Sequence, residues 1–180
     1  MAYIQPLTRQ QVDAATGATL DAVQAKLGVL PNMFRTFAHS PVALNAYMQL
    51  SGLTASGRLN ARQREQIALA VGEANDCGYC VAAHSVIGKG AGLTPAQIEL
   101  AREAQAEQPR DAALLRLASA IVRDRGHVPT AELDAFKTAG FDDGDILEVL
   151  VSVMLNVFTN YTNHLARTDL DFPAAVKRAA

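Results

Sequence analysis

Hydrophobic residues recur at three- and four-residue intervals through most of the chain, which is the spacing of one face of an α-helix. Glycine, proline and short polar clusters interrupt the pattern where helices begin and end. The pattern predicts helices at about residues 19–27, 32–38, 41–54, 60–74, 77–88, 95–106, 109–125, 130–138 and 144–166. Nowhere do β-branched residues alternate with polar ones between turn signals, so no strand is expected. The predicted fold class is all-α, in a single domain over residues 1–180 with less regular ends at 1–18 and 168–180.

Local capping signals support several of these boundaries. Thr94-Pro95-Ala96-Gln97 is a capping box with proline at the first helical position, which predicts a helix from there to about Ala106. Ser40 stands before Pro41 in the same arrangement. Residues 1–18 carry little pattern, and we expect them to be extended or loosely ordered.

The predicted last helix has a narrow polar stripe on an otherwise apolar segment. One interpretation is a solvated stripe on an amphipathic helix; the other is a polar seam that faces a subunit partner or a functional site. A helix with so narrow a stripe is expected to be buried on most sides, which favours an oligomer. The stripe consists of Glu148, Ser152, Asn156 and Asn160 at four-residue intervals, followed by Asn163 and His164.

Composition excludes several classes of protein. Hydrophobic residues make up 49% and charged residues 19%, as in an ordinary globular protein. The net charge is −2 and no basic cluster stands out, so nucleic acid is not an expected partner. The longest apolar stretch, Ile146–Phe158, is too short and too polar to span a membrane. The first ten residues lack the pattern of a signal peptide, so we expect a cytoplasmic protein with no membrane partner.

Both cysteines and one histidine lie within a single ten-residue stretch, NDCGYCVAAH at residues 75–84. Asn75 and Asp76 are good helix N-cap residues, so Cys77 should lie in the first turn of a helix. At about 100° per residue, Cys80 and His84 then lie on one face about 40° apart. A helix N-terminus stabilises a thiolate, and a nearby imidazole can accept its proton. The stretch therefore predicts a reversible dithiol with a base beside it.

Three interpretations of the Cys-x-x-Cys pair remain open. The two cysteines can simply pack as small apolar residues. They can form half of a zinc site, although such a site needs four ligands and only Cys77, Cys80 and His84 are evident. Redox or peroxide chemistry is the third. Cysteines three residues apart in a cytosolic chain are more often catalytic or metal-binding than structural, and the missing zinc ligands leave redox chemistry favoured. That chemistry requires no metal and no cofactor.

The residues around the pair favour the redox interpretation. The stretch ARQREQIALAVGEANDCGYCVAAHSVIGKGAGLT, residues 61–94, closely resembles the core of the alkylhydroperoxidase D (AhpD)-like family, within the carboxymuconolactone decarboxylase superfamily. The shared features are an acidic residue in the preceding helix, C-x-x-C-x-x-x-H, and a glycine-rich exit before a Leu-Thr helix cap. The later NVFTNYTNHLARTDLDFP, residues 156–173, resembles the C-terminal segment of the peroxidase-related branch. The resemblance extends from about Leu30 to Pro173.

The resemblance implies an all-helical fold that assembles into trimers or hexamers and reduces organic hydroperoxides in antioxidant defence. It also implies an external dithiol reductant, for which the family precedent is a lipoyl-bearing protein. The decarboxylase branch lacks the dithiol, so lactone decarboxylation is disfavoured. A non-catalytic redox sensor, a general disulfide reductase and a zinc-binding structural protein are the alternatives.

Roles for individual residues follow from the same resemblance. Cys80, four residues before His84, corresponds to the peroxidatic thiol, and Cys77 is then the resolving thiol, expected to be the more exposed. His84 takes the place of the histidine in a proton relay. The glutamate of that relay lies twelve residues before the first cysteine, which is Glu65; Glu73, closer in sequence, is the alternative.

The residue between the cysteines departs from the family pattern. Tyr79 stands where the founding peroxidase type has a histidine. A tyrosine hydroxyl can donate a hydrogen bond but cannot act as a base near pH 7, because its pKa is near 10. We therefore expect a simpler proton relay and weaker peroxidase turnover.

Overall fold

The computed structural model describes residues 1–176, which contain helices but no strand, as the all-α prediction requires. A short 3₁₀ helix, η1, precedes nine α-helices in this part of the chain. Their bounds are η1 (Arg9–Gln11), α1 (Ala14–Leu27), α2 (Asn32–Phe37), α3 (Pro41–Ala55), α4 (Ala61–Ala74), α5 (Gly78–Gly90), α6 (Pro95–Arg102), α7 (Pro109–Arg123), α8 (Thr130–Thr138) and α9 (Asp143–Ala166).

Two predicted boundaries were wrong. Residues 14–18 are helical rather than extended, because the Asp13 side chain accepts hydrogen bonds from the backbone N–H and the hydroxyl of Thr16 and so caps α1. Helix α6 ends at Arg102 rather than near Ala106. There Ala104 adopts a φ of 54°, and the Gln105 N–H bonds back to the Leu100 carbonyl. Residues 168–176 are not helical, as expected, and the predicted irregular end at 177–180 lies outside the described residues.

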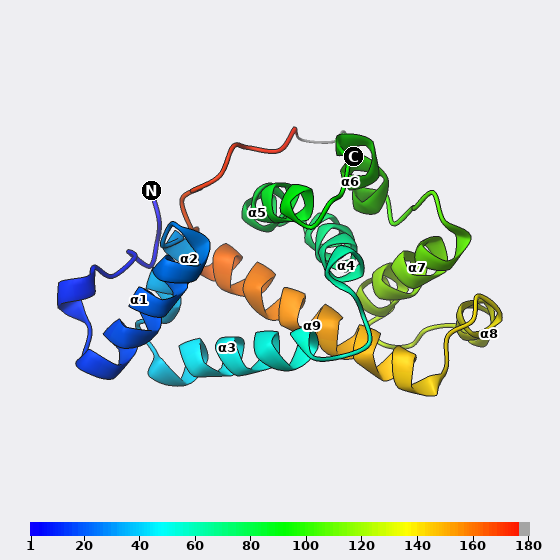
Figure 1. Ribbon diagram of the computed structural model, residues 1–180, viewed down its shortest axis with the longest axis horizontal. Helices are drawn as coiled ribbons and strands as arrows, with labels where there is room; N and C mark the ends of the chain where they lie inside the picture. The colour runs from blue at the N-terminus through cyan, green and yellow to red at the C-terminus, as the bar shows by residue number, and fades with distance from the viewer. Residues whose placement is uncertain (177–180) are drawn as a thin grey trace.

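Helix α4 lies at the centre of the fold and packs against α5, α6, α7 and α9 (Figure 1). Its central residues Ile67, Leu69 and Val71 are fully buried. They belong to the larger hydrophobic cluster, which also contains Leu114, Leu115 and Leu117 of α7 and Val149 and Val153 of α9. Burial of these side chains in a close-packed core holds α4 in place. Helix α4 therefore firmly supports the turn that leads from its C-terminal end into α5.

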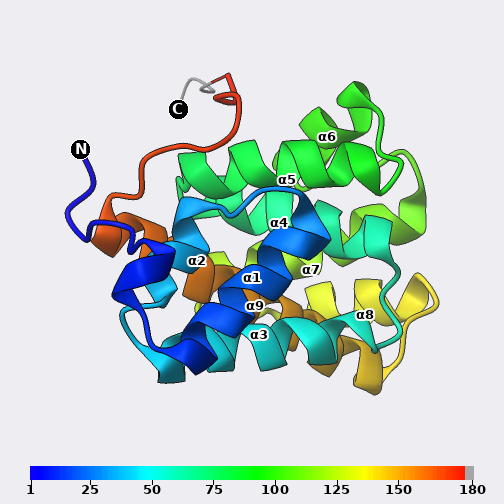
Figure 2. The same cartoon turned by 60° about the vertical axis from the view of Figure 1, so that its left-hand side comes forward.

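A second, aromatic-rich cluster lies under α1, α2 and α3, which Figure 2 brings to the front. Phe37 stacks on Tyr47 and contacts Phe158, with ring centroids 5.4 and 5.1 Å apart. Cys77 and Cys80 belong to this cluster rather than to the larger one. The first turns of α5 are therefore covered by the N-terminal helices of the chain.

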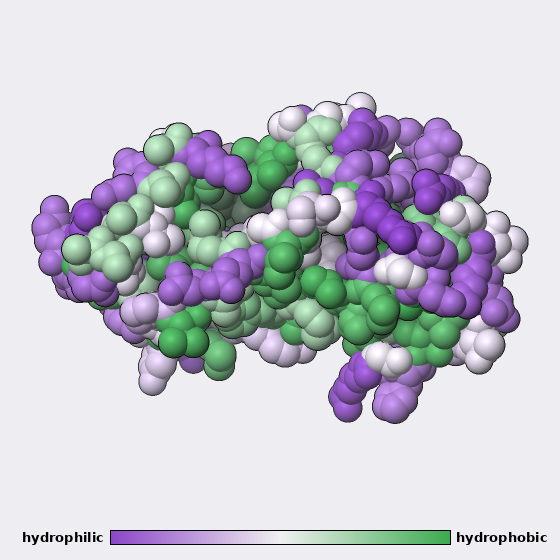
Figure 3. Space-filling view, turned by 60° about the horizontal axis from the view of Figure 1, so that its bottom comes forward, coloured by the Kyte–Doolittle hydropathy of each residue, from purple (hydrophilic) through white to green (hydrophobic). Residues whose placement is uncertain are grey.

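Helix α9 buries its polar stripe and exposes apolar side chains. Ser152, Asn156, Asn160 and Asn163 are each at most 5% exposed, so the interpretation of a solvated stripe was wrong for these residues. The outer face of α9 instead carries exposed apolar residues, and Figure 3 shows them merging with those of α3 into a hydrophobic surface. This exposed apolar surface comprises Leu147, Leu150, Val151, Met154, Tyr161 and Leu165 of α9 and Val42 and Leu53 of α3.

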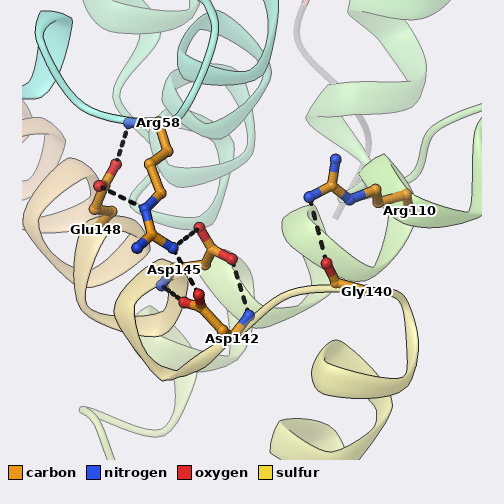
Figure 4. A network of polar contacts seen from close by, with 6 residues as sticks. All are labelled: Arg58, Arg110, Gly140, Asp142, Asp145 and Glu148. Atoms are coloured by element: carbon orange, nitrogen blue, oxygen red, sulfur yellow. Dashed lines mark hydrogen bonds and ion pairs between the residues drawn. The ribbon is translucent and has the colours of Figure 1, made fainter.

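The N-terminal end of α9 is tied to the loop between α3 and α4 (Figure 4). Asp142 caps α9 in a capping box with Asp145. The Arg58 guanidinium pairs with both of these carboxylates, at 2.7 and 3.4 Å, and the Arg58 N–H donates to Glu148. Nearby, Arg110 donates to the Gly140 carbonyl, which steadies the turn that leads into α9.

After α9 the chain turns back across α5 as an irregular segment, here called the C-terminal strap (residues 168–176; Figure 1). Asp171 in the strap accepts hydrogen bonds from the Asn32 N–H and the Tyr79 hydroxyl. At its far end, Arg102 donates to the Val176 carbonyl. The strap is thus fastened at both ends of its path. Within the described residues, no helix is long and apolar enough to cross a membrane.

Candidate active site

A tight turn between α4 and α5 positions the two cysteines. Asp76 adopts a φ of 51°, and the Cys77 N–H bonds back to the Gly72 carbonyl at 2.8 Å. Cys77 is the N-cap residue of α5, so Cys80 lies within its first turn. A side chain at Gly72 would have its Cβ 3.3 Å from the Val81 side chain and 3.6 Å from the Cys80 Cβ. The absence of one lets the cysteine helix lie close against α4.

Both cysteines are free thiols buried beside each other. The two Sγ atoms are 2.7 Å apart, and Cys77 donates its proton towards Cys80. Cys77 is 1% exposed and Cys80 2%. The expectation that Cys77 is the more exposed thiol was wrong, because residues of the aromatic-rich cluster from α2 and the strap pack over the start of α5.

The two thiols differ in their readiness to ionise. The hydrogen bond from Cys77 lowers the pKa of Cys80 to about 6; burial opposes the shift, and the positive charge of His84 and the amides of Asn163 and Asn160 reinforce it. The same hydrogen bond, together with burial, raises the pKa of Cys77 well above its usual range. One thiolate, on Cys80, is therefore the favoured charge state of the pair near neutral pH.

Glu65 of α4 reaches His84 of α5. Glu65 Oε2 lies 2.7 Å from His84 Nδ1, and the side chains are only 16% and 22% exposed. Burial works against a charged imidazole, but the charge and hydrogen bond of Glu65 outweigh it, so the pKa of His84 is raised. Since Nδ1 is occupied by Glu65, Nε2 is the ring nitrogen left for other proton exchange.

Glu73, the alternative relay residue, lies in a different environment. Its carboxylate pairs with the Arg102 guanidinium at 2.8 Å, and the Arg102 side chain is only 3% exposed. Arg102 also pairs with Glu99 and holds the strap through Val176. The structure thus brings Glu65, and not Glu73, to His84.

The Tyr79 hydroxyl bonds to the strap and to α2 rather than to the thiols. Its hydroxyl donates to Asp171 Oδ2 at 2.6 Å and accepts from the Met33 N–H at 3.3 Å. Its ring meets Phe172 edge-on, with centroids 5.8 Å apart. Burial, followed by the hydrogen bond to Asp171, raises the pKa of Tyr79 further. Tyr79 therefore ties the strap to α5, a contact that its spacing from the cysteines did not predict.

Sequence reasoning did not assign a role to two asparagines at the site. Asn163 Nδ2 donates to Cys80 Sγ at 3.3 Å, and Asn160 accepts from Asn75 Nδ2 at 2.8 Å. The signal that could have found them was the four-residue repeat in α9, for which a seam facing a functional site was one interpretation. The next polar residue, His164, is exposed, and its Nε2 lies 3.3 Å from the Asp76 carbonyl in the turn before Cys77.

The zinc interpretation gains no support from the arrangement. Among residues 1–176, no group of three or more histidine, cysteine, aspartate or glutamate side chains is disposed to hold a metal ion. His84 faces Glu65 through Nδ1, and the Cys80 sulfur faces Cys77 and Asn163. The residues instead form an acid–base pair next to a dithiol.

The fold and the site together define a class of protein: an all-helical domain with a buried Cys-x-x-Cys pair beside a His–Glu pair. Residues 41–119 match the model of the carboxymuconolactone decarboxylase family. This segment includes α4, α5 and both cysteines. Comparison with curated proteins gives no match.

Solved structures share the fold over nearly the whole chain. One is an AhpD-core, peroxidase-related protein from Ralstonia eutropha JMP134, 24% identical with a TM-score of 0.86, covering 94% of this chain and 92% of that one. A peroxidase-related protein from Silicibacter sp. TM1040 is 22% identical with a TM-score of 0.81, covering 93% and 92%. Residues 41–119 therefore resemble the carboxymuconolactone decarboxylase family, and residues 1–176 have the fold of AhpD-like, peroxidase-related proteins, in line with the resemblance of the motifs.

The fold also supports other chemistry. The debrominase Bmp8, in a C82A form bound to 2,3,4-tribromopyrrole, is 19% identical with a TM-score of 0.80, covering 94% of this chain and 91% of that one. Proteins with this fold therefore do not all act on the same substrate class, and the reaction of this chain has to be argued from its own site.

Proposed function

We propose that this protein is a thiol-dependent hydroperoxide reductase that cycles Cys80 and Cys77 between dithiol and disulfide in antioxidant defence. The observation that carries the proposal is the inequality of the two thiols. The pKa of Cys80 is lowered to about 6, whereas that of Cys77 is raised. A dithiol peroxidase needs this division of labour, since one sulfur must attack as a thiolate while its neighbour stays protonated until the second step.

In the first step the Cys80 thiolate attacks the terminal oxygen of an organic hydroperoxide. An S–O bond forms and the O–O bond breaks, giving a sulfenic acid on Cys80 and an alkoxide that takes up a proton to become an alcohol. Cys77 then attacks the Cys80 sulfur. The S–S bond forms as the S–O bond breaks, and the leaving hydroxide takes the Cys77 proton to become water. The peroxide is reduced by two electrons and the dithiol is oxidised by two.

In this cycle His84 transfers the protons and Glu65 supports it. His84 accepts the Cys80 proton, and the resulting imidazolium stabilises the thiolate and then protonates the departing alkoxide. Glu65, 2.7 Å from Nδ1, orients the ring and favours its charged form. Tyr79 has no part in proton transfer in this scheme, because its hydroxyl is bonded to Asp171.

An external dithiol must reduce the disulfide, and a lipoyl-bearing protein has the required chemistry. We expect the cycle to run in the cytoplasm, where thiols are kept reduced. We further propose that the protein is a homo-oligomer of the trimeric or hexameric kind. Exposed apolar side chains on one face of α9, such as Leu147, Met154 and Leu165, support this, because large apolar patches usually mark interfaces.

The test is peroxide consumption by the reduced protein, with tert-butyl hydroperoxide and an excess of dihydrolipoamide. Many turnovers per subunit are expected. Cys80→Ser should abolish consumption, and Cys77→Ser should leave a single oxidation that dimedone traps as a sulfenic acid. Equal single oxidations in both variants would contradict the assignment of the two cysteines.

Two other outcomes would redirect the proposal. A single oxidation of the wild-type protein without turnover would indicate a redox sensor. Bromide release from 2,3,4-tribromopyrrole, with no reaction towards peroxide, would indicate that the dithiol serves a reductive dehalogenation. That reaction also consumes two electrons, and its relevance rests on the structural likeness to the debrominase.

A further inference from the structure

Two buried amides of α9 approach the sulfur that the proposed reaction oxidises. Asn160 is fully buried and Asn163 is 4% exposed, and they lie nearly one turn apart on the same helix. Asn163 Nδ2 donates to Cys80 Sγ at 3.3 Å. The Asn160 amide is also close enough to act on Cys80, because both asparagines help to lower its pKa.

A neighbouring residue fixes the direction of the Asn160 amide. Asn75, at the end of α4, donates its Nδ2 to Asn160 Oδ1 at 2.8 Å. With its oxygen occupied by Asn75, Asn160 keeps its N–H₂ group for another partner. Asn75 therefore acts as a positioning residue that sets Asn160 without contacting the sulfur.

Each amide retains one buried group that has no hydrogen-bond partner. These groups are the donor Nδ2 of Asn160 and the acceptor Oδ1 of Asn163. Buried polar atoms are nearly always hydrogen-bonded, since leaving one unpaired costs free energy. An unpaired donor and an unpaired acceptor, three residues apart beside a reactive sulfur, indicate a site whose natural occupant appears only during the reaction.

We propose that Asn160 and Asn163 bind the oxygen atom that Cys80 takes from the peroxide. This inference rests on the proposed function and adds two catalytic residues to it. A sulfenic acid, S–O–H, presents one acceptor oxygen and one donor hydrogen. Its oxygen accepts from Asn160 Nδ2, and its hydrogen is donated to Asn163 Oδ1. Asn163 Nδ2 stays on the sulfur, so the one amide serves the thiolate before the reaction and the hydroxyl group after it.

The proposal implies a division of effects between the two asparagines. Asn163 already bonds the sulfur in the reduced protein, so its loss should mainly weaken the thiolate. The Asn160 donor has no partner at hydrogen-bond geometry in the reduced protein, and it lowers the Cys80 pKa less than Asn163 does. Its loss should therefore mainly weaken the step in which oxygen arrives. A purely structural role in holding α9 would not produce this division.

The experiment compares Asn160→Leu and Asn163→Leu with Asn156→Leu in the full-length protein. Asn156 is a matched control, because it is a 5% exposed asparagine of the same helix whose amide donates to the Ser152 carbonyl. The first readout is the Cys80 pKa, from the pH dependence of alkylation by iodoacetamide with peptide-resolved mass spectrometry. The second is the second-order rate constant for a single oxidation by tert-butyl hydroperoxide at pH 9, where Cys80 is ionised in every variant.

Asn163→Leu should raise the Cys80 pKa by about one unit, since it removes a donor to a charged sulfur. Asn160→Leu should move the pKa less and should lower the rate constant at pH 9 at least about tenfold, as the loss of an oxyanion donor does elsewhere. Asn156→Leu should change neither. If Asn160→Leu does not fold, Asn160→Ala should give the same split.

Unchanged pKa and rate constant in both test variants would overturn the inference, and so would equal losses in all three variants. These results are separable from the failure of the peroxidase proposal. If the wild-type protein is oxidised once without turnover, the peroxidase proposal fails, but the Cys80 pKa and the rate constant of that single oxidation can still be compared among the variants. A wild-type protein that does not react with peroxide at all overturns the oxygen-binding role, whatever its Cys80 pKa.

Discussion

The two ends of α9 both carry a polar cluster, but one is made of charges near water and the other of neutral amides in the interior. At the N-terminal end Arg58 pairs with Asp142, and their side chains are 59% and 61% exposed. At the C-terminal end Asn160 and Asn163 are at most 4% exposed beside Cys80. Helix α9 thus carries an exposed ion pair at its N-terminal end and buried neutral amides at its C-terminal end.

Desolvation explains the difference. Burying an amide is tolerable when most of its groups are hydrogen-bonded, whereas burying an ionised group without a partner costs far more. The charged cluster can therefore serve as an attachment at the surface, where solvent screens it. Buried ions are kept in pairs: Glu65 pairs with His84, and Arg102, whose side chain is 3% exposed, pairs with Glu73 and Glu99. The proposed chemistry adds the Cys80 thiolate to them.

The strongest test of this contrast removes the buried carboxylate. Glu65→Gln leaves His84 without its anion, so we expect peroxide turnover to fall by about a hundredfold, the usual scale for a lost acid–base partner. Glu73→Gln is the matched control on the same helix. It weakens the attachment of Arg102 and should cost about 1–2 kcal/mol in urea unfolding, with turnover within a few-fold of wild type. The reverse order of the two turnover rates would contradict the assignment.

A second test measures the charge state of the buried sulfur. The pKa of Cys80 is lowered to about 6, so the thiolate fraction, and with it alkylation by iodoacetamide, should rise through pH 6 and level off above pH 7. At pH 7 this gives about thirty times the thiolate fraction of an ordinary cysteine. Asn163→Asp should shift the midpoint upwards, because a carboxylate beside the sulfur repels the thiolate. An alkylation midpoint near pH 8.5 in the wild-type protein would show that Cys80 ionises like an ordinary cysteine, and it would contradict the assignment of a buried thiolate.

The smallest effect is expected at the exposed end. Arg58→Ala removes the pairs with Asp142 and Asp145. Water and salt already screen the exposed Arg58–Asp142 pair, and the more buried Asp145 still accepts a hydrogen bond from the Asp142 N–H. We expect the Tm to fall by less than about 3 °C, with no change in peroxide turnover. A larger thermal shift would mean that this cluster supports the core, and a loss of turnover would mean that the two ends of α9 are coupled.

Much of the fold was predictable because the ends of a helix are determined by capping residues that are close to them in sequence. The capping box at Thr94 and the acidic residues at 142 and 143 mark the starts of α6 and α9 within four residues of sequence. The start of α1 at Asp13 follows the same rule and was missed because the preceding residues carry little hydrophobic pattern. The spacing of Cys77, Cys80 and His84 likewise needed only the geometry of one helix.

The rest of the site depends on residues that are distant in sequence. The family spacing favoured Glu65 and left Glu73 as the alternative. Tertiary contacts separate them, because Glu65 reaches His84, whereas Glu73 pairs with Arg102, 29 residues further along the chain. The burial of Cys77 could not be foreseen, because it depends on packing from α2 and the strap. Which face of α9 is buried is also a tertiary property, and it reversed the interpretation of its polar stripe.

In the proposed cycle, the strap is expected to limit the speed at which the disulfide is reduced. Both sulfurs are at most 2% exposed, and Asp171 fastens the strap to Tyr79 beside them. A protein reductant is too large to touch a buried disulfide, so it can react only when the covering residues move aside. At high reductant concentration the rate should then stop rising and equal the opening rate. At such reductant concentrations the turnover number equals the rate at which the strap opens and does not depend on the reactivity of the two sulfurs.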